Sequence, residues 1–91
     1  MSLTSKEYGF RVDGSWVEIT GATKAVNPEW SLLIDGDTVD TQRKTGEFEL
    51  TGTLPNGKTL TAQINQGSLG NVDLLILLDG DKIQKLSGFL L

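Results

Sequence analysis

The 91-residue chain contains no cysteine and no histidine. Without cysteine it has no disulfide framework, no zinc ribbon and no thiol nucleophile. Without histidine it lacks the commonest general base of enzymes and the commonest protein ligand of transition metals. We therefore expect a non-enzymatic protein with no catalytic and no cofactor-binding residues, and we assign no metal site.

Positive charge and long apolar runs are also scarce. Lysine and arginine total 8 against 12 aspartates and glutamates, which gives a net charge of −4. Binding of nucleic acid needs clustered lysine and arginine, and Arg43-Lys44 is the sole adjacent pair, so we expect no nucleic-acid partner. The longest apolar run, residues 74–78, is far shorter than the roughly twenty residues that span a membrane, so we expect no membrane span.

The N-terminal residues differ from the rest of the chain. Residues 1–6 are mostly polar and lack the apolar stretch of a signal peptide. We interpret them as a disordered or cloning-derived segment and residues 7–91 as one domain, because this length suits a single hydrophobic core. The missing leader favours a cytoplasmic location, or an extracellular one if the chain is an excised domain.

A short pattern recurs along the chain with a period near twenty-two residues. Three copies contain Asp-Gly at positions 13–14, 35–36 and 79–80, and a fourth contains Asn56-Gly57. Asp-Gly and Asn-Gly favour the positive φ angles of a two-residue hairpin turn. The fourth copy has Pro55 in front, which suits a type I turn followed by a bulge at Gly57, and therefore a three-residue loop. The repeat predicts four hairpins.

Alternation of apolar and polar residues predicts strands on both sides of each turn. We expect an all-β fold, an eight-stranded antiparallel β-sandwich built from four consecutive hairpins. Residues 72–78 are apolar on both faces, which is typical of a central strand. The predicted core between the two sheets consists of Trp30, Phe48, Leu50, Leu60, Ile64, Leu74 and Ile76.

Aspartates around the turns offer a calcium hypothesis. Carboxylate oxygens are the hard ligands that calcium prefers, and the candidates are Asp35, Asp37, Asp40, Asp79 and Asp81. The spacing does not follow an EF-hand loop, and turn formation by itself accounts for Asp beside Gly. Both interpretations stay open at this point.

Two tryptophans differ in phase. Trp30 alternates in phase with Leu32 and Ile34, which places it in the core. Trp16 is out of phase with Val17 and follows a turn directly, so we expect it to face solvent. An exposed indole can stack on a sugar ring, although single surface aromatics are common without any function. Trp16 is the one residue that we predict for a contact surface.

Two further features have two interpretations each. Glu47 and Glu49 share one face of a strand, either as paired carboxylates of a hydrolase or as a solvated outer face. The apolar residues 89–91 belong either to a final strand that buries Phe89 or to an exposed edge that pairs between chains. A homodimer through an edge strand therefore stays open.

The order of motifs resembles one known family. Val17-Glu18-Ile19, Ile34-Asp35-Gly36 and residues 46–52 (GEFELTG) are similar to the start of a domain of the Fas apoptotic inhibitory molecule family, and residues 62–64 and 77–86 are similar to its end. The resemblance implies an eight-stranded antiparallel sandwich. It also implies a non-enzymatic cytosolic role, because animal members, which carry two such domains, act in cell-death control and protection from protein aggregation. The family has no catalytic motif to carry across.

Three functional hypotheses follow. The leading one is a non-enzymatic protein–protein interaction module, whose protein partner binds an edge strand or the Trp16 region. The alternative is a glycan- or ligand-binding β-sandwich module excised from a larger surface or secreted protein. The third is calcium-dependent adhesion through the Asp-Gly-Asp turns.

Overall fold

The computed structural model describes residues 5–23, 27–67 and 69–89, and these form eight strands and no helix. The all-β prediction is confirmed. The first strand begins at Ser5, two residues before the domain start expected from the sequence, and residues 1–4 lie outside the described ranges. The strands are β1 (Ser5–Val12), β2 (Ser15–Ala22), β3 (Glu29–Ile34), β4 (Asp37–Arg43), β5 (Gly46–Thr53), β6 (Thr59–Gln66), β7 (Asn71–Leu78) and β8 (Asp81–Phe89).

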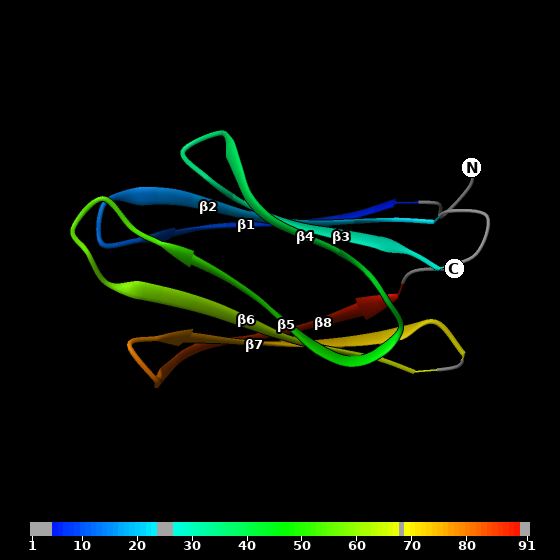
Figure 1. The fold of residues 1–91 in the computed structure, drawn as a ribbon. Coiled ribbons are helices and arrows are strands. Elements are labelled where there is room, and N and C mark those ends of the chain that lie inside the picture. The colour runs from blue at the N-terminus through cyan, green and yellow to red at the C-terminus, as the bar shows by residue number, and fades with distance from the viewer. Residues whose placement is uncertain (1–4, 24–26, 68, 90–91) are drawn as a thin grey trace.

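The strands form two antiparallel sheets in simple chain order. One sheet has the order β1-β2-β3-β4 and the other β5-β6-β7-β8. Figure 1 shows them as two layers, with the turns β1–β2, β3–β4, β5–β6 and β7–β8 at one end of the sandwich. The prediction of four consecutive hairpins is confirmed, and the sequence repeat places all four turns at the same end.

Backbone angles explain why the turns need Asp-Gly. The φ angles are 48° and 84° at Asp13 and Gly14, and the other two Asp-Gly turns have nearly the same values. Two successive positive φ angles define a type I′ turn, whose twist matches that of a β-hairpin. The longer fourth turn differs as predicted: the Gly57 amide donates to the Leu54 carbonyl at 2.9 Å, and Gly57 has a φ of 88°.

The core fills the space between the two sheets. All seven predicted core residues are buried, and β7 has hydrogen-bonded neighbours on both sides, as its apolar faces indicated. Trp30, fully buried on β3, donates its indole Nε1 proton to Oε1 of Gln66 on β6 at 3.0 Å. A Cβ at Gly21 would lie 2.7 Å from the Trp30 ring, so glycine makes room for the indole. This hydrogen bond joins the two sheets inside the core.

The two sheets are structural repeats of each other. Asp35 and Asp79, the first residues of equivalent turns, lie 44 positions apart. One residue is left without a Cα partner in each half, Val39 in β4 and Ile83 in β8, and these also lie 44 positions apart. An unpaired residue of this kind is a β-bulge. In the repeat, β8 therefore corresponds to β4, and β5 corresponds to β1.

Replacing Gln66 with leucine tests the bond inside the core. The change leaves the Trp30 indole N–H buried without this acceptor, and an unsatisfied buried donor costs about 1–3 kcal/mol. We expect the free energy of unfolding in urea to fall by that amount. The same substitution at exposed Gln63 on the same strand should cost less than about 0.5 kcal/mol. Equal losses in the two variants would contradict the proposed role of the bond.

Candidate functional site

The turn aspartates bind backbone amides. Oδ1 of Asp35 accepts a hydrogen bond from the Trp16 amide at 2.9 Å, while the Asp35 amide donates to the Trp16 carbonyl at 2.8 Å. Asp79 makes the same pair of bonds with Thr59, at 2.8 Å each. Each carboxylate thus extends the backbone ladder beyond the strand, in equivalent places of the two sheets.

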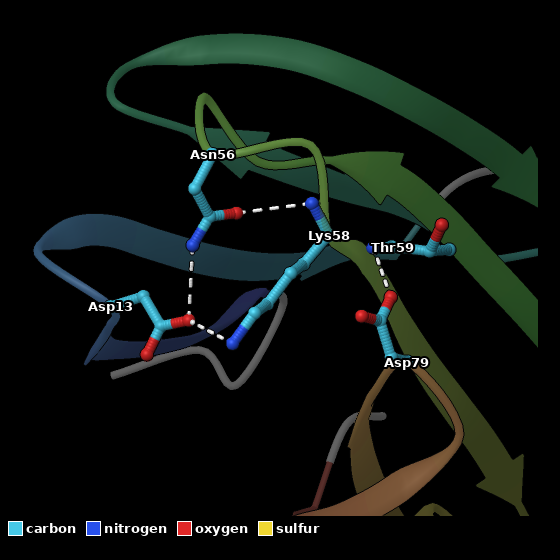
Figure 2. A network of polar contacts seen from close by, with 5 residues as sticks. All are labelled: Asp13, Asn56, Lys58, Thr59 and Asp79. Carbon is cyan, nitrogen blue, oxygen red and sulfur yellow. Dashed lines mark hydrogen bonds and ion pairs between the residues drawn. The ribbon is translucent and has the colours of Figure 1, made fainter.

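A second network joins the turns of the two sheets (Figure 2). Oδ2 of Asp13 accepts from Nδ2 of Asn56 at 3.0 Å and lies 3.3 Å from Nζ of Lys58. The Asn56 side chain in turn accepts from the Lys58 amide at 3.0 Å. The fourth copy of the sequence repeat therefore contacts the first, and the carboxylate of Asp13 is held by two side chains.

The five candidate calcium ligands can now be placed in the structure. Asp35, Asp79 and also Asp40, whose Oδ2 accepts from the Thr51 amide at 2.9 Å, each hold a backbone N–H. Asp37 and Asp81 are exposed. Within the described ranges, no group of three or more acidic side chains is arranged so that it could hold a metal ion. The five predicted ligands are thus not gathered at one place.

Substitution of Asp79 with alanine should therefore weaken the fold itself. It removes the bond to the Thr59 amide and places alanine at a φ of 49°, so we expect a loss of about 1–2 kcal/mol in urea unfolding. Asp81→Ala removes an equally exposed carboxylate next to the same turn and is the matched control. Addition of millimolar calcium should leave both free energies unchanged, and a stabilisation that Asp79→Ala abolishes would support the calcium hypothesis.

Trp16 lies on the outer face of the first sheet, and its side chain is 41% exposed, as predicted. Its ring does not stand free, because a Cβ at Gly9 would lie 2.5 Å from Cζ2 of the indole. The guanidinium of Arg11 lies 5.8 Å from the ring centroid, within the range of a cation–π interaction. The indole thus packs across β1, and the neighbouring glycine and arginine explain its position.

The outer edge of β1 is the second part of this site. The backbone N–H and C=O of Trp16 both bond to Asp35, on the β3 side of β2. Arg11 pairs with Trp16 across β1–β2, and two residues so paired direct their backbone groups either both toward each other or both away. The backbone groups of Arg11 therefore point away from β2. Direction alternates along a strand, so Glu7 and Gly9 also direct their N–H and C=O groups outward. No described strand other than β2 pairs with β1. We call the outward backbone groups of Glu7, Gly9 and Arg11 the β1 edge.

The corresponding edge of β5 is covered. Asp40 of β4 accepts from the Thr51 amide, and Nε2 of Gln42 donates to the Glu49 carbonyl. Val39 packs over Gly52, where a Cβ would lie only 2.7 Å from Cγ2 of the valine. Side chains of β4 thus take the place of a neighbouring strand, at the corner where the two sheets meet (Figure 1). The two sheets thus differ at their first strands: the edge of β5 is covered, whereas the edge of β1 is open.

The outer face of the second sheet carries an open hollow of about 800 Å³. Glu47 and Glu49 of β5 line one side and Lys82 and Lys85 of β8 line the other, with half-buried Leu75 between them. Gln63 donates to Oε2 of Glu49 at 2.9 Å. The two glutamates thus lie on a polar outer face, which is one of their two predicted interpretations. Sequence reasoning missed the lysines on the opposite side because it did not predict that β6 pairs with β7, which joins the third and fourth hairpins in one sheet.

The C-terminal strand is both paired and at an edge. β8 pairs with β7 as far as Phe89 opposite Asn71, and among the described strands it has no partner on its other side. The prediction that Phe89 is buried concerns a side chain that the structure does not describe. Residues 90 and 91 also lie outside the described ranges. Lys82 and Lys85 are exposed on β8, and lysines of this kind oppose pairing at a sheet edge.

The pKa of one side chain on β1 is shifted. Burial raises the pKa of the Tyr8 hydroxyl above its ordinary value, and the negative charge of Asp73 raises it further. The hydroxyl therefore stays protonated at physiological pH, and Tyr8, partly buried against the core, adds no charge beside the β1 edge.

Comparisons with known proteins gave no match to any family model, curated protein or solved structure. The part of the chain that the structure describes contains no helix that is long and apolar enough to cross a membrane.

Proposed function

We propose that this chain is a non-enzymatic protein-interaction module that binds an extended segment along the β1 edge. The observation that carries the proposal is the difference between the two sheets at their first strands, β1 and β5. The backbone of β5 is covered by Asp40 and Gln42, whereas the equivalent backbone groups of Glu7 and Gly9 on β1 have no strand beside them among the described residues. An added strand supplies those missing hydrogen bonds, which is the mode known as β-augmentation.

Side chains next to the edge supply selectivity. Trp16 lies across Gly9 and beside Arg11, and tryptophan and arginine are the residue types most enriched among the contacts that dominate binding energy. Glu7 and Arg11 give the edge one charge of each sign. A segment that pairs with β1 therefore meets an aromatic surface between two opposite charges.

We also propose that the chain is related to the Fas apoptotic inhibitory molecule family and is cytosolic like its members. The support for this is the sequence resemblance, together with an eight-stranded antiparallel sandwich of the kind that this resemblance implies. A module without catalytic histidine or cysteine agrees with the non-enzymatic role of that family.

Proline at position 7 provides the test. The Glu7 amide points away from β2, so Glu7→Pro keeps the β1–β2 bonds, removes an outward donor and blocks a docking strand. We expect peptides selected from a phage-displayed random library to bind the wild-type protein and Glu7→Ala, and to lose binding to Glu7→Pro. Peptides that bind Glu7→Pro as well as Glu7→Ala would show that the β1 edge is not the binding surface.

A second candidate function follows from the hollow on the second sheet. Its volume of about 800 Å³ and its lining, in which carboxylates, amides and two lysines surround apolar surface at Leu75, suit a ligand such as a glycan, whose ring faces pack on apolar surface and whose hydroxyl groups hydrogen-bond to polar side chains. Trp16 lies on the other sheet, with its ring against Gly9, and does not line the hollow.

A glycan array distinguishes the two surfaces. If the hollow binds sugar, Gln63→Leu and Asp73→Ala should lose at least about tenfold of the affinity, because each removes a polar group from the lining. Trp16→Ala should leave the signal unchanged. A signal that disappears only in Trp16→Ala would assign sugar binding to the indole instead.

A further inference from the structure

We infer that the segment that occupies the β1 edge is β1 of a second copy of this chain, so that two first sheets join into one continuous eight-stranded sheet. This inference rests on the proposed function and names its partner. The pattern of residues along the edge carries the argument, because it is complementary to itself when two copies run antiparallel.

The register of the dimer follows from backbone geometry. In an antiparallel pair, residues whose backbone groups point toward each other must face each other. The β1 edge offers Glu7, Gly9 and Arg11, so a two-fold axis at Gly9 places Gly9 opposite Gly9 of the second copy. Glu7 of each copy then lies opposite Arg11 of the other. Roughly six backbone hydrogen bonds can form in this arrangement.

Charge and size both favour this partner. Each Glu7–Arg11 pair is a cross-strand contact of opposite charges, which stabilises a sheet, and the two-fold axis creates it twice. Gly9 at the axis places no side chain on the face of the sheet, so the two strands meet there without side-chain crowding. The indole of Trp16 covers Gly9, so the two indoles lie on the same face near the axis. The 41% of Trp16 that is exposed in one copy is then available for this contact.

The edge of β8 does not fit a second copy equally well. β8 carries Lys82 and Lys85 and no acidic side chain between Lys82 and Phe89. Antiparallel self-pairing of β8 would bring ammonium groups of the same sign close together, which is unfavourable. Charge therefore favours self-pairing through β1 over self-pairing through β8.

Charge reversal tests the pairing of Glu7 with Arg11. We expect sedimentation equilibrium from about 1 μM to about 1 mM to show a dimer of the wild-type chain. Glu7→Arg alone and Arg11→Glu alone should each raise the dissociation constant about tenfold, because each places like charges opposite each other twice. An equimolar mixture of the two variants should associate again, and so should the double variant. Glu47→Arg and Lys44→Glu, at exposed positions outside β1 and β8, are charge-matched controls and should dimerise like the wild type.

Disulfide trapping tests the register, because the chain has no cysteine of its own. Residues 7 and 11 of opposite copies would have Cα atoms about 5.5 Å apart, which a disulfide can span. Under mild oxidation, Glu7→Cys mixed with Arg11→Cys should give a covalent dimer of the two variants. Each variant alone should not, because like positions lie roughly 13 Å apart along the strands.

The outcomes separate this inference from the proposed function. A wild-type chain that is monomeric throughout the concentration series overturns the inference, and so does a dimer that Glu7→Arg, Arg11→Glu and Glu7→Pro leave unchanged. If the monomer still binds library peptides in a way that Glu7→Pro abolishes, the proposed function stands with a different partner. If peptide binding is also absent, both fail.

Discussion

The register of this protein is set by its hairpin turns. Each type I′ turn needs two successive positive φ angles, and Asp-Gly supplies them three times with nearly identical values. A two-residue turn leaves no freedom in how the flanking strands align, and a shift by one residue would move every side chain to the opposite face. Burial of Trp30, exposure of Trp16 and the outward direction of the Gly9 backbone all depend on this constraint.

The outward backbone groups of an edge strand need hydrogen-bond partners, and the two sheets differ in how their first strands obtain them. Asp40 and Gln42 hydrogen-bond to the backbone of β5 from an adjacent strand of the other sheet. The bulge at Val39, packed over Gly52, brings β4 close enough for these contacts. At β1 no described strand performs this role, so the repeat ends in an edge that can accept a partner. The two sheets thus have a sealed edge and an open edge in equivalent places, and the partner that we propose binds the open one.

Much of the fold could be predicted from the sequence because its signals are local. The turn at Pro55 and Gly57 was predicted with its extra residue, and the phase difference between Trp16 and Trp30 predicted which indole is exposed. The site was predicted less completely. The exposure of Trp16 was predicted, and its role as a contact residue stays a prediction. Nothing in its neighbourhood in the sequence indicates that its ring covers Gly9, because that contact depends on the β1–β2 register.

The sequence by itself determined the turns, the strand faces and the composition of the core, since each depends on residues within one hairpin. Only the tertiary structure decided which polar groups meet: Gln66 with the indole of Trp30, Asp13 with Lys58, and Asp40 with the Thr51 amide. The members of these pairs lie 11 to 45 positions apart, on different strands or turns, so no local pattern encodes them. The aspartates appear in the sequence as a row of equivalent carboxylates. In the structure Asp35 and Asp79 each bind a backbone amide of their own sheet, whereas the packing of the two sheets gives Asp13 and Asp40 partners on the other sheet.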